Sequence, residues 1–285
     1  MFSLKKTNLF YAVIFISTFL HSNSMQDNPT KDFVTIAILA KDKAHALPLF
    51  LDCIEHQTWP KDKTKIYIRT NNNNDNTSEI LEQWLDKVGH LYAEVFFDAT
   101  DVPQPVQQYK QHEWNNERFE VLGKIRELSV QWAFNHNSHY FVVDCDNFIK
   151  PHTLERLMNV QLPIVAPFLV TGHNYYSNYH AAIDANGYLA QTPFYEMIFN
   201  RLLIGLLQVP VVHCTYLIRK ECLPYVWYRD NSGRYEYVIF SDTARQNNIA
   251  QYIDNREIYG YVSFAEDSTT LSMEPWLQDI QAWFK

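Results

Sequence analysis

The sequence predicts an α/β fold with a mostly parallel, doubly wound sheet, and three observations support this prediction. Apolar, β-branched runs alternate with segments whose apolar residues recur every three or four positions. Such alternation indicates strands joined by crossover helices, which makes neighbouring strands parallel. The chain of 285 residues is 47% hydrophobic and 15% aromatic, which is enough for one large core.

The predicted elements begin in the order β-α-β-α-β. The run "FVTIAILA" (33–40) is typical of a fully buried strand, and the helical spacing that follows it ends at Trp59-Pro60. Asn76 or Thr77 is suited to cap the next helix. The predicted strands cover 33–40, 65–70, 91–97, 140–143, 162–169, 209–219 and 249–255. The predicted helices cover 44–57, 77–88, 117–136 and 236–248, and the chain beyond 255 is predicted to be irregular.

The first residues have the layout of a secretory signal peptide. Two lysines precede an apolar stretch from Leu9 to Leu20, and small and polar residues follow it. We predict that residues 1–24 are cleaved and that 25–285 form a single domain, with an uncleaved anchor as the alternative. The mature protein then has no stable membrane span. It belongs to the secretory pathway: the ER lumen of a eukaryote, or the periplasm or exterior of a bacterium.

Charge and cysteine content exclude some classes of function. The net charge is −8, and the signal segment contributes two lysines and no acid, so the mature chain is more acidic still. An acidic surface without a basic stripe repels polyanions, which argues against a nucleic-acid partner. The four cysteines are too few and too scattered for a disulfide framework, although one Cys214–Cys222 bridge is left open.

The strand at 140–143 runs directly into two aspartates, Asp144 and Asp146. Side chains at i and i+2 of an extended chain project to the same side, so both carboxylates can meet one ligand. Adjacent carboxylates repel each other unless a cation relieves them. Oxygen ligands of this kind suit Mg²⁺ or Mn²⁺ and leave positions open for phosphate oxygens.

An acidic pair in a loop is by itself a weak signal, because such pairs are commonly solvated or serve as caps. The end of a strand in a doubly wound sheet is a stronger context, since ligands bind beyond the carboxyl ends of such strands. The preceding helix carries Lys124 and Arg126. These cations either reach an anionic ligand or form an ordinary solvated face.

Several stretches, in the same order, resemble the amino-terminal glycosyltransferase unit of the procollagen galactosyltransferase and cerebral endothelial cell adhesion molecule family. Any one of them alone would not be specific, whereas together they span about residues 33–270. They are "ILAKDKAHALPLFL" (38–51), "NNDNTSEILEQWL" (73–85), "KIREL" (124–128), "YFVVDCDN" (140–147), "VAPFL" (165–169), "YSNY" (176–179), "GYLAQTP" (187–193), "VPVVHCTYLI" (209–218) and "REIYGY" (256–261).

The resemblance implies a nucleotide-sugar-binding fold of the GT-A type and an inverting hexosyl transfer that depends on Mn²⁺ or Mg²⁺. It implies a UDP-sugar donor, with galactose as the sugar, and a hydroxylated protein side chain (hydroxylysine-like) or a glycan as acceptor. Glu236 matches an acid that serves as the general base. The implied donor-binding residues are Ala40, Lys41, Asn71, Asp75, Lys124, Arg126 and Asp144. The implied metal ligands are Asp144, Asp146 and Asp267, and the residues implied at or behind the acceptor are Tyr176, Asn178 and His213.

The sequence departs from the family pattern at several of these positions. Lys41-Asp42 stands where the family has Arg-Asn, and Tyr235 stands where it has the first Asp of Phe-Asp-Asp. Asp267 replaces a late histidine, and three asparagines from Asn71 replace Asp-His-Asn. A catalytically silent member that binds a sugar or a protein is therefore a second hypothesis. A bacterial or viral enzyme that builds surface glycan is a third.

Some residues keep two readings. His213 either touches the acceptor or a metal, or is a hydrogen-bonded core residue. Tyr175, Tyr176 and Tyr179 form either a sugar-stacking wall or ordinary loop packing. Cys145, between the two aspartates, is expected to be a buried small residue rather than a reactive thiol.

Overall fold

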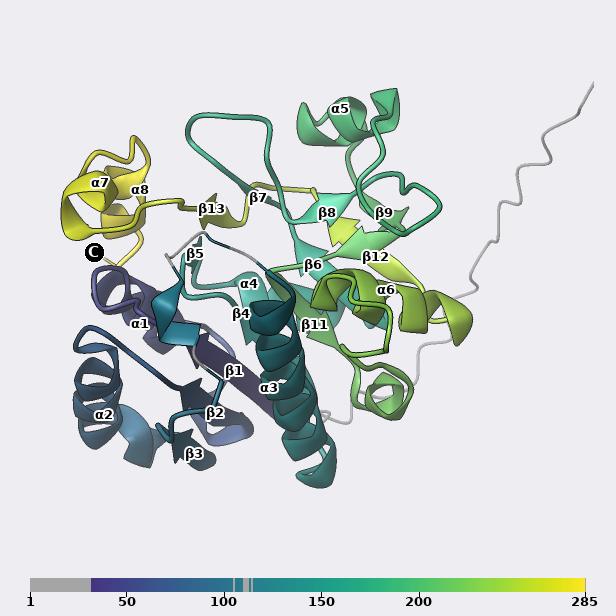
Figure 1. The fold of residues 1–285 in the computed structure, drawn as a ribbon. Coiled ribbons are helices and arrows are strands. Elements are labelled where there is room, and N and C mark those ends of the chain that lie inside the picture. The colour runs from purple at the N-terminus through teal and green to yellow at the C-terminus, as the bar shows by residue number, and fades with distance from the viewer. Residues whose placement is uncertain (1–31, 105, 110–112, 114, 285) are drawn as a thin grey trace, which may run out of the picture. The chain divides into compact units, whose positions relative to one another are not determined.

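The computed structural model describes residues 32–104, 106–109, 113 and 115–284 (Figure 1). The predicted signal peptide, residues 1–24, lies outside these residues. The described chain is built around an eight-stranded sheet in the order β3-β2-β1-β4-β11-β6-β12-β9. Its strands are β1 (Val34–Ala40), β2 (Thr64–Thr70), β3 (Glu94–Asp98), β4 (His139–Val143), β6 (Ile164–Pro167), β9 (Leu206–Val209), β11 (Thr215–Ile218) and β12 (Gln251–Asp254).

The first half of this sheet is parallel, as the sequence predicts. β1 pairs in parallel with β2 on one side and with β4 on the other, and β2 pairs in parallel with β3. The chain therefore winds outward from β1 to β3 and then crosses back to place β4 beside β1. This reversal is a topological switch point, and in α/β sheets ligands bind in the crevice at its carboxyl end.

Helices cover both faces of the sheet, and alternate strand residues enter two different cores. Ile36 and Ile38 of β1 pack in the core formed with α1 (Leu47–Glu55), α2 (Thr77–Val88) and α4 (Thr153–Asn159). Ala37 faces the other core, to which α3 (Asn116–Asn135) and α6 (Glu236–Gln246) contribute. The period of two along the strand thus sends neighbouring side chains into opposite cores. The doubly wound prediction is confirmed.

The second half of the sheet is mixed and departs from the prediction. The predicted strand 162–169 divides into β6 and β7 (Leu169–Val170), which belong to different sheets. The predicted strand 209–219 takes in the last residue of β9, then β10 (Val211–Val212), which pairs with β8 (Tyr179–His180), and then β11 of the main sheet. Cys214 causes this break, because its φ of 63° cannot continue an extended strand.

The prediction that the chain beyond 255 is irregular was wrong. The tail contains β13 (Gly260–Val262), which joins β5 (Asn147–Ile149) and β7 in a three-stranded sheet, and it then forms two short helices. These helices were too short to show periodicity in the sequence. The remaining elements are α5 (Pro193–Phe199), α7 (Ser268–Ser272), α8 (Leu277–Ala282) and the 3₁₀ turns Lys61–Lys63, Gly89–Leu91, Val106–Gln108 and Lys220–Tyr225.

Two further observations bear on the sequence predictions. All four cysteines are free thiols, so the Cys214–Cys222 bridge is not formed. Within residues 32–284, apart from the few positions that the structure leaves undescribed, no helix combines the length and apolar character needed to cross a bilayer.

Candidate active site

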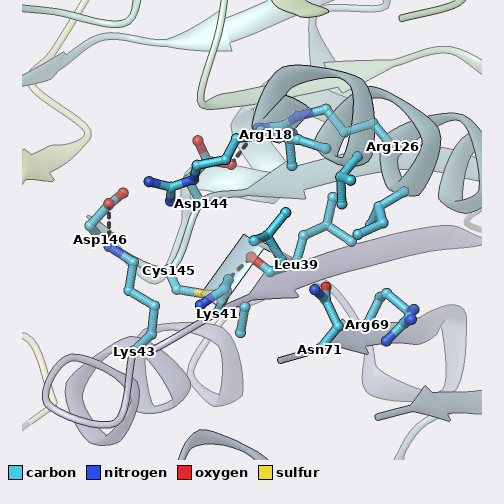
Figure 2. Close-up of a pocket in the computed structure, with 15 residues that line it drawn as sticks. Leu39, Lys41, Lys43, Arg69, Asn71, Arg118, Arg126, Asp144, Cys145 and Asp146 are labelled. Atoms are coloured by element: carbon cyan, nitrogen blue, oxygen red, sulfur yellow. Dashed lines mark hydrogen bonds and ion pairs between the residues drawn. The ribbon is translucent and has the colours of Figure 1, made fainter. Parts of the chain in front are cut away.

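The ends of β1, β2 and β4 meet around one cavity, here called the strand-end cavity. Its location is the switch point between β1 and β4, and Figure 2 shows side chains from all three strand ends pointing into it. Five of its lining residues are basic and two are acidic, so the lining is cationic overall. The lining residues are Leu39, Ala40, Lys41, Lys43, Arg69, Asn71, Val106, Arg118, Val121, Leu122, Ile125, Arg126, Asp144, Cys145 and Asp146.

Each aspartate of the acidic pair has its own cationic partner. Arg126 donates from Nη2 to Oδ1 of Asp144 at 2.9 Å, and Lys43 donates from Nζ to Oδ2 of Asp146 at 2.8 Å (Figure 2). Burial by itself raises the pKa of the Asp144 carboxyl and outweighs the opposing charge of Arg126. The mutual repulsion expected of these carboxylates is thus relieved by two protein cations.

Lys43 owes its position to the first residue of α2 and to the segment just before it. Thr77 accepts a hydrogen bond from the Lys43 backbone N–H at 2.7 Å, and Asp75 accepts one from the Ala44 N–H at 3.0 Å. Burial alone would lower the pKa of Lys43, but the Asp146 carboxylate raises it above its usual value. The ammonium is therefore charged, and its backbone is held in place.

The loops at the strand ends contain two non-glycine residues in the left-handed region. Asp42 has φ 52° and Asn72 has φ 48°. Short polar side chains tolerate this conformation because they hydrogen-bond locally. Asp42 accepts from the Asn74 N–H at 2.6 Å, and Asn72 accepts from the Val102 N–H at 3.0 Å. The asparagine run thus links three loops around the cavity.

Arg126 is buried between two carboxylates. Its Nε lies 3.6 Å from Oε1 of Glu236, and the two side chains are only 5% and 6% exposed. Within the described structure, Nε and Nη1 of Arg126 and Oε2 of Glu236 are buried without a hydrogen-bond partner. Buried polar atoms are nearly always paired, so Nη1 of Arg126 and Oε2 of Glu236 are candidates for hydrogen bonds with a bound polar group.

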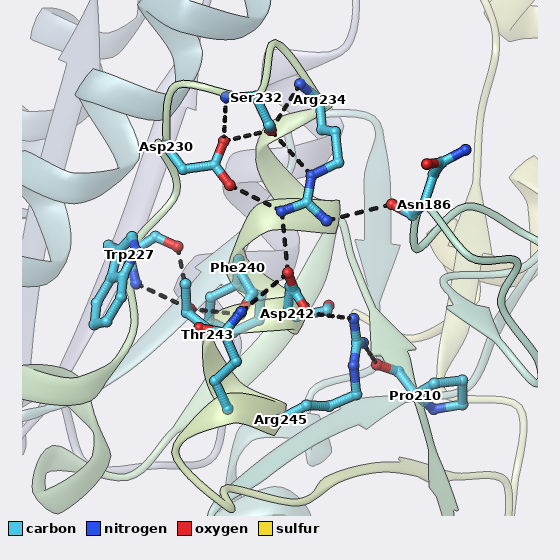
Figure 3. Close-up of polar contacts among 12 residues, drawn as sticks. Asn186, Pro210, Trp227, Asp230, Ser232, Arg234, Phe240, Asp242, Thr243 and Arg245 are labelled. Atoms are coloured by element: carbon cyan, nitrogen blue, oxygen red, sulfur yellow. Dashed lines mark hydrogen bonds and ion pairs between the residues drawn. The ribbon is translucent and has the colours of Figure 1, made fainter.

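Glu236 is the first residue of α6, and its position is fixed by the loop before it. Arg234 donates to Asp230 at 2.8 Å, to Asp242 at 3.0 Å and to the Asn186 carbonyl at 3.3 Å (Figure 3). This guanidinium ties the loop to the helix and to a separate turn. Burial raises the pKa of the Glu236 carboxyl, and Arg126 opposes that shift only in part.

A second cavity, here called the tyrosine cavity, encloses about 690 Å³. Tyr176 and His213 line it, and Cys214 links Tyr176 to the acidic pair: its Sγ lies 3.7 Å from the Tyr176 hydroxyl, and its carbonyl accepts from the Asp144 N–H at 3.2 Å. Tyr237, next to Glu236, lies 5.1 Å from His213 between ring centroids. The tyrosine cavity is lined by Tyr175, Tyr176, Ser177, Tyr179, His180, Leu189, Ala190, Gln191, Thr192, Pro193, Tyr195, Glu196, Asn200 and His213.

Comparison with known proteins shows the family to which the chain is related. Residues 31–278 match the family described as glycosyltransferase family 25, N-terminal domain. The chain belongs to this family. The resemblance that the sequence motifs predict is therefore confirmed.

Curated relatives of this glycosyltransferase family 25 domain are longer than the chain. Procollagen galactosyltransferase 2 of Mus musculus is 35% identical over 245 residues, which are 82% of this chain and 39% of the relative. Inactive glycosyltransferase 25 family member 3 of Homo sapiens is 29% identical over 266 residues, 90% of this chain and 44% of the relative. The chain thus spans about two fifths of the length of these relatives.

Solved structures support the fold. S. aureus TarS 1–349 in complex with UDP-GlcNAc aligns with 88% of this chain and 64% of its own, with a TM-score of 0.53 and 14% sequence identity. At that identity the likeness concerns the fold alone. The predicted GT-A-type architecture is confirmed.

The structure brings together most of the donor-binding residues that the sequence predicts for the family 25 domain. Of the implied residues, six line the strand-end cavity: Ala40, Lys41, Asn71, Arg126, Asp144 and Asp146. Tyr176 and His213 line the tyrosine cavity, where Tyr175 and Tyr179 join them. Cys145 is 2% exposed and burial raises its pKa, as expected of a packing residue.

Other predicted residues lie elsewhere. Lys124 is exposed and does not line the strand-end cavity, because two residues along a helix turn a side chain by about 200° away from Arg126. Asp75 supports the Lys43 loop instead of lining the cavity. Asp267 caps α7 by accepting from the Thr270 N–H at 2.8 Å, and it lies outside both linings.

Glu236 and Asn178 lie outside both cavity linings. Glu236 lies behind Arg126 and belongs to neither lining. Asn178 is fully buried, and it donates to the Pro167 carbonyl at 2.9 Å and the Thr215 carbonyl at 3.2 Å. It therefore joins strands beneath the site and makes no contact with an open cavity.

Sequence reasoning missed three cations of the strand-end cavity, which are Lys43, Arg69 and Arg118. Arg118 shares a face of α3 with Leu122 and Arg126 at steps of four residues, which was a usable signal. Arg69 is a single cation near the end of β2, and nothing in the sequence around it indicates a binding role. Lys43 depends on the fold of the loop after β1, which a sequence does not reveal.

The residues fit a divalent cation whose ligands come partly from the protein and partly from a substrate. Within the described parts of the chain, no three His, Cys, Asp or Glu side chains are grouped to hold a metal ion. Mg²⁺ and Mn²⁺ are, however, often bound through one or two carboxylates together with substrate phosphates and water. Asp144 and Asp146 supply those carboxylates, on a lining whose other charges suit phosphates.

Proposed function

We propose that this domain is an inverting, metal-dependent glycosyltransferase that moves galactose from UDP-galactose to a hydroxylated acceptor. One observation carries the proposal: the strand-end cavity combines two carboxylates with five cations at the switch point of the sheet. The names of the relatives support galactose as the sugar. The tyrosine cavity supports an acceptor site beside the donor.

On the donor side, the cations attract the diphosphate and Asn71 offers hydrogen bonds. Nη1 of Arg126 has no hydrogen-bond partner in the described structure and is suited to a phosphate oxygen. Asp144 and Asp146 would hold the divalent cation. When bound, that cation offsets negative charge on the departing UDP as a Lewis acid.

On the acceptor side, a hydroxyl in the tyrosine cavity would attack the anomeric carbon from the face opposite UDP. The new carbon–oxygen bond would form as the bond to the phosphate oxygen breaks, and the hydroxyl proton would pass to Glu236, which lies outside the lining but is followed in the chain by Tyr237, a neighbour of His213 in that cavity. The unpartnered Oε2 and the raised pKa of Glu236 support its role as general base. Tyrosine faces in the cavity suit a sugar ring or a peptide chain.

The proposal is tested by UDP-galactose hydrolysis and by transfer to hydroxylysine peptides and saccharides, with and without Mn²⁺. Asp146→Asn is expected to lose activity by at least about 100-fold, since one metal ligand is removed. Asp267→Asn is the matched control, because asparagine preserves the helix cap. Activity that ignores Mn²⁺ and survives Asp146→Asn would exclude this function.

A silent, ligand-binding member is the second candidate. One relative that shares 29% identity over 90% of this chain is named inactive, and both aspartates here are held by protein cations. Binding of UDP without hydrolysis or transfer to any acceptor would favour this candidate.

We also propose that residues 1–24 direct the domain of residues 25–285 to the secretory pathway.

A further inference from the structure

Lys43 occupies one of the two Asp146 oxygens with which a divalent cation at the acidic pair would compete. Its Nζ lies 2.8 Å from Oδ2 of Asp146, and the two side chains are 15% and 27% exposed. The Lys43 backbone is held by hydrogen bonds at both its N–H and its carbonyl, which fixes the start of the side chain. Thr77 accepts from its N–H, and its carbonyl accepts from Ala46 and Leu47.

The remainder of the cavity also disfavours a metal ion that arrives alone. Asp144 is likewise paired with Arg126 through Oδ1, so one oxygen of each carboxylate is already held by a protein cation. Five basic side chains face two acidic ones in the lining, and a bare dication would enter a field of its own sign. A diphosphate reverses this situation, because it brings negative charge that the cations attract.

We propose that Lys43 is a placeholder for the divalent cation. It holds Asp146 until the donor arrives, so the metal binds together with the diphosphate and not before it. The incoming phosphates attract the ammonium away from Asp146, and the same carboxylate oxygen then passes to the metal. This inference rests on the proposed function and adds to it an order of binding and a positioning role for Lys43.

The test measures Mn²⁺ binding without catalysis. The electron paramagnetic resonance signal of free Mn²⁺ is titrated against the 25–285 chain and its variants, with and without UDP. Wild type is expected to bind Mn²⁺ at least about tenfold more tightly when UDP is present, a factor in line with the strength of one hydrogen bond to a charged group. Lys43→Met is expected to bind Mn²⁺ alone at least about tenfold more tightly than wild type.

Lys41→Met is the matched control. Lys41 lines the same cavity, but its ammonium pairs with Asp42. Its removal changes the cavity charge equally and is expected to change the affinity for Mn²⁺ alone by less than about threefold. Circular dichroism checks that each variant is folded, and Lys43→Gln replaces Lys43→Met should the latter fail to fold.

Three outcomes are distinct. Tighter Mn²⁺ binding by the Lys43 variant, but not by the Lys41 variant, supports the placeholder. Unchanged affinity of Lys43→Met for Mn²⁺ alone overturns it, as does a wild type that binds Mn²⁺ equally well without UDP. Absence of Mn²⁺ binding in every protein, even with UDP, overturns the metal-dependent function itself.

Discussion

Replacement of Arg126 by methionine is predicted to destabilise the fold, because it strips two carboxylates of their shared partner. Arg126 contacts Asp144 at 2.9 Å and Glu236 at 3.6 Å. Removal of one partner of a buried ion pair costs about 3–5 kcal/mol in the free energy of unfolding. Asp144 keeps 26% exposure, so water compensates part of this loss and the lower value of about 3 kcal/mol applies.

For a domain of this size, that loss corresponds to a fall in Tm of about 6–12 °C. The assay is urea and thermal unfolding at pH 7, with Lys124→Met as the matched control. Lys124 is an exposed cation on the same helix, and its replacement is expected to change the free energy of unfolding by less than about 0.5 kcal/mol. Both replacements remove one positive charge and keep a helix-forming residue.

The loss in Arg126→Met should also depend on pH. Burial raises the pKa of Glu236 already in wild type, and the shift grows once the guanidinium is gone. A carboxyl with a raised folded pKa binds its proton more tightly in the folded state, so folding is favoured as pH falls. The deficit should therefore shrink from pH 7 to pH 5. A variant as stable as wild type at pH 7, or a deficit that grows on acidification, would refute this reasoning.

Three further predictions concern the acceptor side. Glu236→Gln should abolish transfer but keep UDP binding. In wild type, the pKa seen in the acid limb of kcat/KM should lie above the usual range for glutamate, since burial raises the pKa of Glu236. Loss of UDP binding in Glu236→Gln would instead show that Glu236 serves to hold Arg126 in place. Burial lowers the pKa of His180 to about 4, so the folded state disfavours the charged imidazole and the free energy of unfolding falls as the pH drops below 6.5. The fall is about 2 kcal/mol from pH 7 to pH 5, and urea unfolding of His180→Gln should show a smaller one. Arg234→Met, which frees the loop before Glu236, should lower kcat at least about tenfold with little change in the KM for UDP-galactose, whereas an unchanged kcat would show that the loop is held without it.

The sequence predicted the half of the fold in which strands and helices alternate regularly. β1 and β4 consist almost entirely of apolar residues, and β2 carries the β-rich core Ile66–Ile68, so the strand ends, and with them Ala40, Asn71 and Asp144, could be located. The order of the strands was not predictable from these runs. It decides, however, that the three ends meet, because β4 returns to lie beside β1.

The residues that the sequence did not reveal depend on loops and on single backbone conformations. Cys214, with its left-handed backbone, divides one apolar run into strands of two sheets. A cysteine in the sequence does not indicate such a backbone conformation. Lys43 reaches Asp146 from a backbone that Thr77, the first residue of α2, holds in place. Lys124 looked equivalent to Arg126 in the sequence, and only the rotation of the helix separates an exposed cation from a buried one.

The most direct test of the central claim is the Mn²⁺-dependent stabilisation of the chain by UDP. At a UDP concentration 100 times its Kd, with Mn²⁺ in excess, wild type should gain about 2.7 kcal/mol in the free energy of unfolding. That gain corresponds to a rise in Tm of about 5–10 °C, and Asp146→Asn should show no part of it that depends on Mn²⁺. A wild-type Tm that Mn²⁺ and UDP leave unmoved would contradict the claim that the acidic pair at the end of β4 binds a metal and a diphosphate.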